Sequence, residues 1–287
     1  MFDSKFQGAA EQKAFALTSL TNPGKSCATR GKPCATRDKG RATASSSRYP
    51  NLLEFELELW SKGFRRIAGV DEAGRGPLAG PVVAAAVVFE QDFIEKEKDG
   101  LLVSLTDSKK LTANQRNVFF ALLTQSSHVE IGIGFGSVAE IDKINILCST
   151  HLAMNRAIAC LCLMPDHAII DGLPVNNLPC PSTAVIRGDS RSISVAAASV
   201  IAKVVRDQWM MELDRWHPEY GFSSHKGYGT PTHIQALLKH GATEYHRHSF
   251  RPVRETEDIR NRKKTSRHDQ GHGTHDSPFF ARKPYGS

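Results

Sequence analysis

The segment 66–81 constrains the fold of this chain more than any other part of the sequence. An apolar run, residues 67–70, ends in the adjacent carboxylates Asp71 and Glu72, and a loop rich in glycine and proline leads into a second apolar run, residues 82–89. Such runs bounded by turn residues predict two strands. Because neighbouring side chains on a strand point to opposite faces, both carboxylates can serve one site only if the strand ends there. Two acids beside a Gly/Arg loop suggest a divalent cation near a phosphate, and the alternative is a solvated strand end before a tight turn.

At 287 residues, the chain has room for one medium domain with tails or for two small domains. Its apolar content of 40% is ordinary for a globular protein with a hydrophobic core. The longest apolar runs, residues 81–89 and 195–202, are too short to span a bilayer, and Asp3, Glu11 and Gln12 interrupt any N-terminal signal pattern. We therefore expect a cytoplasmic protein with no membrane partner.

The formal net charge of +7 is concentrated in the two ends of the chain. Residues 1–48 contain nine Lys and Arg against three Asp and Glu, residues 255–287 contain seven against five, and residues 49–254 contain 21 against 22. We predict a basic, low-complexity, disordered extension over 1–48, a folded region over 49–254 and a flexible charged tail over 255–287. A tandem repeat in the extension indicates repeat slippage, with a weak nucleic-acid-binding arm as the alternative. Any groove for a polyanion must therefore be a local patch.

The six cysteines form no CxxC pair, and their spacing matches no usual zinc site. We expect reduced thiols throughout. The four cysteines of the folded region are predicted to be packing residues: Cys148, Cys160, Cys162 and Cys180.

The hydrophobic pattern along the folded region alternates between helical and strand periods. The predicted strands cover residues 67–70, 81–89, 129–135, 168–172 and 183–187. The predicted helices cover residues 51–62, 139–164 and 231–239 and two segments that begin after Thr112 and near Ser194. In the helix predicted to begin near Ser194, a run of three alanines, residues 196–198, lets another element approach closely.

Three predicted strands end in acidic residues, which are Asp71 with Glu72, then Asp171, then Asp189. Strands of one sheet bring such residues side by side at one edge. Carboxylates gathered without a cation repel each other, and an all-oxygen set suits Mg²⁺ or Mn²⁺ rather than zinc. Two such ions about 4 Å apart can activate a water and stabilise the leaving oxygen in phosphodiester hydrolysis. The alternatives are a turn at Asp171 and a helix cap at Asp189.

The segment 69–82, Gly-Val-Asp-Glu-Ala-Gly-Arg-Gly-Pro-Leu-Ala-Gly-Pro-Val, closely resembles the signature of the ribonuclease HII family. The resemblance covers roughly residues 51–254 and continues, in the same order and spacing, through residues 107–111, 144–147, 170–172, 188–189, 197–207, 226–230 and 246–250.

This resemblance implies a ribonuclease H-like α/β fold, with a mixed β-sheet flanked by helices and a helical C-terminal part. It also implies an endonuclease that uses Mn²⁺ or Mg²⁺ and cleaves RNA in RNA–DNA hybrids and at single ribonucleotides embedded in duplex DNA. The products would carry a 3′-hydroxyl and a 5′-phosphate. We expect a monomer whose catalytic domain is residues 49–254 and whose partners are these nucleic acids.

Carried over by position, Asp71, Glu72, Asp171 and Asp189 would be the catalytic acids, the first three being the predicted metal ligands. The loop Gly74-Arg75-Gly76 would read the ribose 2′-hydroxyl, the group that distinguishes RNA from DNA, because glycines let backbone groups approach it.

Tyr228 would stack on the sugar at the RNA–DNA junction. Lys203, Lys226 and Arg206 are predicted phosphate contacts, although Arg206 can equally form a structural ion pair with Asp207.

Three other functions compete with this prediction. A hybrid-binding protein that lost catalysis is disfavoured because all four carboxylates are present. Another ribonuclease H-like nuclease or recombinase is disfavoured by the Gly-Arg-Gly loop and Tyr228. A ribonuclease HIII would be expected to carry a structured N-terminal domain, which the low-complexity segment 1–48 does not resemble.

Overall fold

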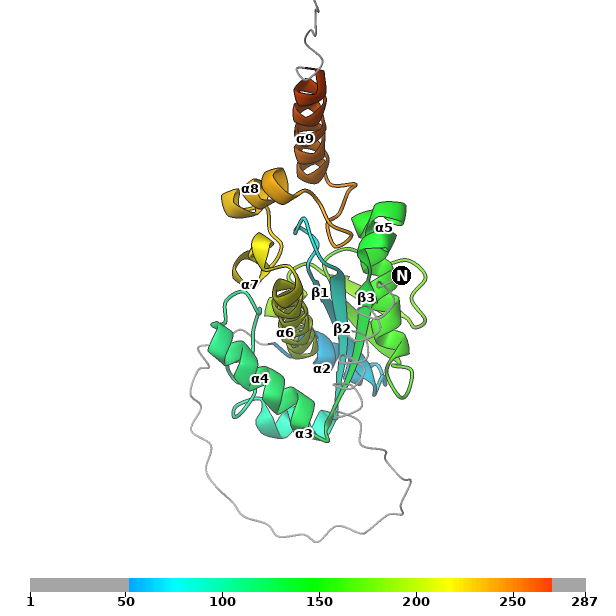
Figure 1. The fold of residues 1–287 in the computed structure, drawn as a ribbon. Coiled ribbons are helices and arrows are strands. Elements are labelled where there is room, and N and C mark those ends of the chain that lie inside the picture. Colours follow the sequence, from blue (N-terminus) through cyan, green and yellow to red (C-terminus); the bar gives the residue numbers. More distant parts are fainter. Residues whose placement is uncertain (1–51, 270–287) are drawn as a thin grey trace, which may run out of the picture.

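The computed structural model describes residues 52–269, so the predictions for residues 1–51 and 270–287 lie outside the described part (Figure 1). Five strands form one sheet in the order β3-β2-β1-β4-β5. Strands β1, β2 and β3 are antiparallel neighbours, whereas β4 and β5 run parallel to β1, so the sheet is mixed as expected. The strands are β1 (Ile67–Ala73), β2 (Val82–Phe89), β3 (Val129–Gly136), β4 (His167–Asp171) and β5 (Ser182–Val185).

Helices cover both faces of the sheet, with α5 on one face of β2 and β3 and α6 on the opposite face of β1 and β2 (Figure 1). Within residues 52–269, no helix combines the length and hydropathy needed to cross a membrane. The α-helices are α2 (Glu54–Ser61), α3 (Gln91–Glu97), α4 (Ala113–Gln125), α5 (Val138–Ala159), α6 (Ile193–Trp216), α7 (Phe222–His225), α8 (Pro231–His240) and α9 (Arg251–Asp269), and the 3₁₀ turns are η1 (Gly188–Ser190) and η2 (Pro218–Tyr220).

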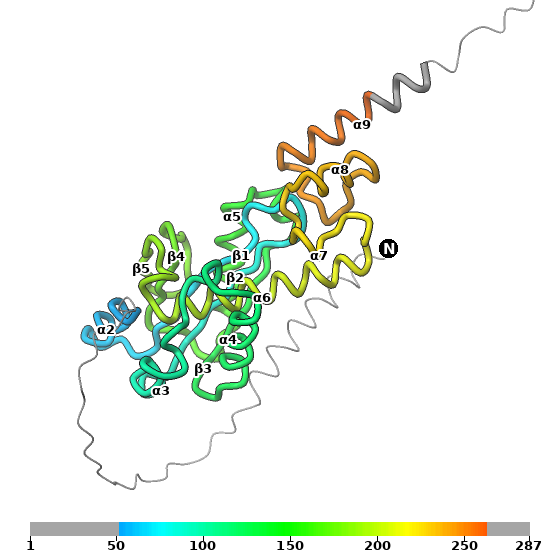
Figure 2. Tube along the Cα trace, turned by 90° about the vertical axis from the view of Figure 1, so that its left-hand side faces the viewer, coloured from blue at the N-terminus to red at the C-terminus, as the bar shows by residue number. Residues whose placement is uncertain are grey.

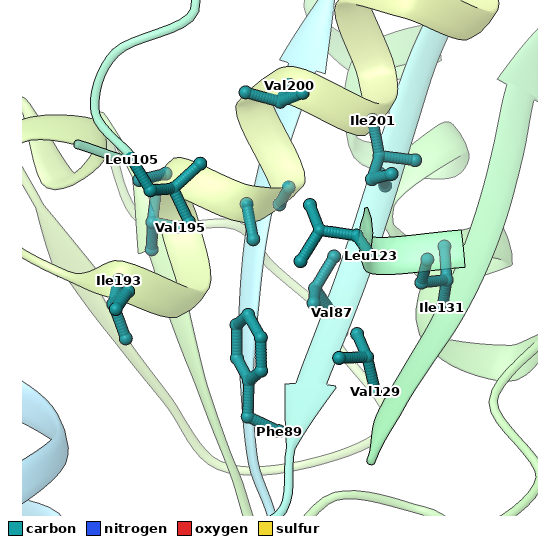
Figure 3. Close-up of a cluster of buried hydrophobic side chains, with 14 of the residues drawn as sticks. Val87, Phe89, Leu105, Leu123, Val129, Ile131, Ile193, Val195, Val200 and Ile201 are labelled. Atoms are coloured by element: carbon teal, nitrogen blue, oxygen red, sulfur yellow. The ribbon is translucent and has the colours of Figure 1, made fainter. Parts of the chain in front are cut away.

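The apolar run of β2 is buried along its whole length because helices lie on both sides of it. Its side chains alternate between two cores, as the period of a strand requires. Val87 and Phe89 belong to the core beneath α6, together with Leu123 of α4 and Ile201 of α6 (Figure 3). This double packing makes β1 and β2 a rigid support for whatever follows them.

Helix α6 crosses β1 at very short range. An ideal Cβ on Gly69 would lie 2.0 Å from the carbonyl carbon of Ser194, so only glycine fits there. The start of α6 is held by Glu56, a fully buried residue whose Oε1 accepts hydrogen bonds from Ser192 Oγ at 2.6 Å and from Ser194 N at 3.0 Å. The closest approach thus lies at Ser194 and Val195, just before the alanine run 196–198, whose three residues are fully buried.

The C-terminal part is helical, as expected, and packs beyond the end of the sheet (Figure 2). Its small core unites α6, α7, α8 and α9 with the loop between β1 and β2. The members of this core are Leu78, Ala79, Met210, Leu213, Tyr220, Phe222, Leu237 and Val253.

Three details differ from the predictions. The chain continues as α9 to Asp269, whereas the charged residues from 255 onward were expected to form a flexible tail. Helix α5 ends at Ala159 rather than near residue 164, and it is broken at Asn145, whose φ of 68° is left-handed. Such a φ interrupts helical hydrogen bonding, which the hydrophobic period does not report.

The four cysteines of the described chain are free thiols, as expected, but the packing role predicted for them is wrong for three. The thiols that are exposed are Cys148, Cys160 and Cys162, whereas Cys180 is half-buried. Cys148 faces outward from α5, and Cys160 and Cys162 lie on either side of Leu161, which is the residue of that segment that enters the core.

Candidate active site

Three aspartates from different elements meet at one edge of the sheet. Asp71 lies in β1, Asp171 ends β4 and Asp189 lies in η1, and one carboxylate oxygen from each lies within 4.8 Å of the others. The parallel pairing of Val70 with Ile170 places the first two acids next to each other. Gly188 N donates to Asp171 Oδ1 at 2.7 Å, which brings η1 against the end of β4. We call these three residues and Glu72 the acid cluster.

Asp71 lies at the centre of the acid cluster and is only 5% exposed. Burial, and then the nearby charges of Glu72 and Asp171, raise the pKa of its carboxyl well above the usual value. A hydrogen bond from Ser199 of α6 opposes this rise, and Ser199 Oγ lies 2.9 Å from Ser108 Oγ. The close crossing of α6 over β1 therefore supplies the hydroxyl that supports this carboxylate.

Glu72 lies outside the group of three aspartates. The sequence predicted that the strand ends at the two carboxylates, with the break in residues 73–76, whereas β1 continues to Ala73 with Glu72 paired to Ala84 of β2. The strand is longer than predicted because its pairing with β2 continues past the two charged residues, and the chain turns away only at Gly74. Glu72 nevertheless remains close enough for its charge to raise the pKa of Asp71. Burial raises the pKa of Glu72, and Arg75, whose Nη1 lies 3.4 Å from Glu72 Oε1, partly opposes that rise.

Asp189 has its pKa raised to about 6 by burial, and then by the charges of Asp107 and Asp171. Asp107 was not among the predicted site residues, although it begins the segment 107–111 of the family resemblance. Its neighbour Lys109 acts in the opposite direction and lowers the pKa of both Asp189 and Glu72. A loop far along the chain from β1 therefore contributes both signs of charge to the site.

The loop between β1 and β2, residues 74–81, follows the acid cluster directly, and we call it the recognition loop. Gly74 has a φ of 99°, and an ideal Cβ there would lie 2.0 Å from Arg206 Nε, so glycine is required. At Gly76, an ideal Cβ would lie 3.6 Å from the ring of Tyr228, which is 47% exposed. The structure thus places the predicted Gly-Arg-Gly segment and the predicted tyrosine side by side.

A chain of buried histidines holds the backbone at Tyr228. Thr243 N donates to His246 Nδ1 at 3.0 Å, so the proton of that ring is on Nε2. His246 Nε2 lies 3.1 Å from His233 Nε2, and His233 Nδ1 donates to the carbonyl of Tyr228 at 2.9 Å. Burial lowers the pKa of His233 to about 4 and that of His246 to about 3, so both rings are neutral at pH 7. No role for these two histidines was predicted from the sequence.

The predicted phosphate contacts differ in how accessible they are. Lys203 Nζ lies 2.7 Å from Asp207 Oδ1, and both side chains are partly exposed. Arg206 is only 1% exposed and pairs with backbone carbonyls, so the surface contact and the ion pair with Asp207 considered for it are both wrong. Lys226 donates from Nζ to the carbonyl of Ser223 at 2.5 Å.

The comparisons with known proteins agree with this geometry. The sequence model of the family described as Ribonuclease HII matches residues 68–253. The chain belongs to the ribonuclease HII family. It is 50% identical over 214 residues to the ribonuclease HII of Geobacillus thermodenitrificans, an alignment that covers 74% of this chain and 78% of that protein. It is also 50% identical to the ribonuclease HII of Magnetococcus marinus, covering 71% of this chain and 92% of that protein.

Among solved structures, the chain is similar to ribonuclease H2 from Pyrococcus horikoshii OT3, with a TM-score of 0.57 and 26% identity. That match covers 68% of this chain and 99% of the other. As a member of the ribonuclease HII family, the protein is a phosphodiester hydrolase that cleaves the RNA strand of RNA–DNA hybrids.

The donor set of the acid cluster fits a hard divalent cation. Its converging ligands are carboxylate oxygens from Asp71, Asp171 and Asp189, and carboxylates are the donors that Mg²⁺ and Mn²⁺ prefer. Burial, and then the charges of neighbouring acids, raise the pKa values of Asp71 and Asp189, and a bound cation would oppose both effects.

Proposed function

We propose that this ribonuclease HII cuts both long RNA–DNA hybrids and single ribonucleotides embedded in duplex DNA, leaving a 3′-hydroxyl and a 5′-phosphate. The observation that carries this proposal is the position of the recognition loop. The loop begins directly after the β1 carboxylates, and Arg75 lies 3.4 Å from Glu72. A group that identifies a ribose therefore lies beside the groups that support hydrolysis.

The acid cluster is proposed to hold one or two divalent cations, Mn²⁺ or Mg²⁺. Asp71, Glu72 and Asp171 are the ligands expected from the sequence, and the proximity of Asp189 to two of them supports it as a further ligand. Such cations, when bound, lower the pKa of a coordinated water and stabilise the leaving oxygen. Ser199 orients the carboxylate of Asp71 by donating a hydrogen bond, and Lys109 limits the negative charge on the side of Asp189.

Ribose recognition is proposed to divide between the recognition loop and Tyr228. The 2′-hydroxyl is both donor and acceptor, so backbone groups at Gly74, Arg75 and Gly76 can bind it where no side chain intervenes. The exposed ring of Tyr228, adjacent to Gly76, can pack on the neighbouring sugar when that sugar lacks a hydroxyl. Lys226 follows α7, two residues before Tyr228, and Lys203 lies on α6, close enough for its charge to act on Lys226. Both lysines are proposed to contact phosphates. We further propose that the enzyme acts as a monomer in the cytoplasm.

The test uses a DNA duplex that contains one ribonucleotide, an RNA–DNA hybrid and an all-DNA duplex of the same sequence, each with Mg²⁺ or Mn²⁺. We expect cleavage of the first two substrates only, with a 5′-phosphate on the downstream product. The Asp71→Asn variant should cut none of them. Cleavage of the all-DNA duplex, or failure of the wild-type enzyme to cut at the single ribonucleotide, would contradict the proposal. Binding of the hybrid without any cleavage would instead favour an inactive hybrid-binding protein.

A further inference from the structure

Two arginines lie buried beneath the recognition loop, and no carboxylate in the described part of the chain pairs with either of them. Arg206 of α6 is 1% exposed and Arg247 is fully buried. Within residues 52–269, neither guanidinium forms an ion pair with an acid. Asp207, which follows Arg206 in the chain, is paired with Lys203, and Asp142, whose charge acts on Arg247, accepts hydrogen bonds from the backbone of residues 248 and 249. Burial of a cation is costly unless its donors are satisfied. The donors of both arginines are satisfied here by backbone carbonyls alone.

Arg247 ties together the two ends of the recognition loop. Its Nη2 donates to the carbonyl of Gly74 at 2.6 Å, and its Nη1 donates to the carbonyl of Arg75 at 2.9 Å. Its Nε donates to the carbonyl of Gly80 at 3.0 Å, and Nη2 reaches the same oxygen at 2.8 Å. One rigid fork thus fixes the orientation of three peptide groups that lie several residues apart.

Arg206 joins the recognition loop to the segment that carries Tyr228. Its Nε donates to the carbonyl of Pro81 at 3.0 Å and its Nη2 to that of Ala79 at 3.1 Å. Its Nη1 donates to the carbonyl of Lys226 at 3.1 Å. The loop and the tyrosine are therefore attached to a single guanidinium, and a shift of one would displace the other.

These contacts decide which backbone groups remain available to a substrate. The carbonyls of Gly74 and Arg75 point inward to Arg247. The backbone N–H groups of Arg75 and Gly76, by contrast, find no acceptor in the described chain, and both residues are exposed. Two free donors consequently face outward next to Tyr228, close to the acid cluster.

We propose that Arg206 and Arg247 are the positioning residues for ribose recognition: by binding the loop carbonyls from beneath, they orient the N–H groups of Arg75 and Gly76 toward the ribose. The inference rests on the proposed function. Neither arginine touches the substrate. Lysine cannot replace them, because an ammonium is a point donor that cannot hold several carbonyls in one plane.

The experiment measures discrimination rather than activity alone. For each variant, the KM for a duplex with one ribonucleotide is compared with the Ki of the all-DNA duplex as a competitive inhibitor, and the thermal unfolding midpoint is recorded. The Arg206→Lys and Arg247→Lys variants retain the positive charge but lose the planar guanidinium and its several N–H donors. The matched control is Arg66→Lys, because Arg66 also donates to a carbonyl, that of Leu163, and lies at the opposite end of β1.

We expect the Ki/KM ratio to fall at least about tenfold in both variants, since hydrogen bonds to charged groups contribute on that scale. The control should retain the wild-type ratio. A ratio that stays at the wild-type value while activity and the unfolding midpoint fall would overturn the inference and leave the arginines a purely structural role. If the wild-type enzyme fails to cut at the single ribonucleotide, the proposed function fails instead, so the two failures are distinguishable.

A second measurement keeps the inference testable if the lysine variants do not fold. Amide hydrogen exchange of the wild-type enzyme is followed at Arg75 and Gly76, with Ca²⁺ in place of Mg²⁺ to slow hydrolysis. We expect rapid exchange in the free enzyme, protection by the ribonucleotide duplex and less protection by the all-DNA duplex. Equal protection by both duplexes, or no change on binding, would overturn the inference.

Discussion

The recognition loop directly follows Asp71 and Glu72 of the acid cluster, but the two regions are built from different groups: charged side chains in the cluster and backbone dipoles in the loop. The cluster gathers side-chain charges of one sign, and burial and mutual repulsion raise the pKa of Asp71, Glu72 and Asp189. The loop presents backbone groups, which two buried cations, Arg206 and Arg247, hold from beneath. The cluster keeps like charges together, which suits the cation proposed to bind there, whereas the loop arranges neutral dipoles, which we propose identify the ribose hydroxyl.

The two regions also differ in what supports them. Strand pairing between β1 and β4 places Asp71 beside Asp171, so the sheet itself resists the repulsion. The recognition loop has no such ladder and depends on residues far along the chain, including the carbonyl-bound fork of Arg247 and the histidine chain behind Tyr228. Catalysis is therefore expected to fail when a charge is removed, and specificity is expected to fail when a position shifts.

The largest effect should follow from Asp71→Asn, which removes one charge and keeps the shape. We expect kcat to fall at least about a thousandfold, because metal-assisted charge stabilisation contributes several kcal/mol. The unfolding midpoint should stay equal or rise, since a buried repulsive charge is lost. Steady-state cleavage and thermal unfolding measure both, with Asp92→Asn on the distant helix α3 as the control. Activity near the wild-type level in Asp71→Asn would contradict a catalytic role for the acid cluster.

The next effect concerns the other region and uses Tyr228→Ala. Stacking on an aromatic ring contributes about 1–3 kcal/mol per base, so we expect kcat/KM at a single ribonucleotide to fall about 5- to 150-fold. The unfolding midpoint should change little because the ring is 47% exposed. Tyr228→Phe keeps the ring and should behave like the wild type. Parallel losses of activity and stability in the alanine variant would assign the ring to packing instead.

The pH dependence of the unfolding free energy should show whether His233, the ring that donates to the carbonyl of Tyr228, is buried in its neutral form. Burial lowers the pKa of His233 to about 4 in the folded enzyme from the ordinary 6.5. Below pH 6.5 the unfolded chain takes up the proton first, so stability falls as the pH falls toward 4. Between pH 7 and pH 5 the wild type should lose about 2 kcal/mol more of its unfolding free energy than His233→Gln.

Urea unfolding at the two pH values measures this difference. The control is His128→Gln, at an exposed histidine that pairs with Glu90. Identical pH dependence in the wild type and His233→Gln would mean that the folded enzyme takes up this proton as readily as the unfolded chain.

The smallest effect should come from Lys203, whose charge is shared with Asp207. Lys203→Met should raise KM about two- to threefold and reduce the salt dependence of binding by about one phosphate contact. Asp207→Asn frees the ammonium and should lower KM. Changes of KM in the same direction for both variants would exclude a phosphate contact at Lys203 and restrict recognition to the loop and Tyr228.

Much of the acid cluster could be predicted because its residues follow predicted apolar strands and fall in segments that resemble the ribonuclease HII family. The prediction did not anticipate that β1 continues through Glu72, since apolar periodicity stops at the first charged residue while hydrogen bonding to β2 does not. Asp107 escaped notice because a loop residue shows no periodicity, although its segment belonged to the resemblance. The helix α9 was missed for a related reason: its mainly polar sequence shows no apolar period.

By itself, the sequence determined most of the elements and the acids that follow the apolar runs, because periodicity and turn residues report local backbone conformation. The resemblance to the ribonuclease HII family, also carried by the sequence, singled out the glycines of the recognition loop and Tyr228. Only the tertiary structure decided that Arg206 and Arg247 serve the loop from within. The guanidinium of Arg247 reaches the carbonyl of Arg75 across 172 residues of chain, and only the packed structure shows that, among residues 52–269, no acid pairs with it. Whether an arginine is a surface contact or a buried support depends on packing between distant segments, and no local pattern records that packing.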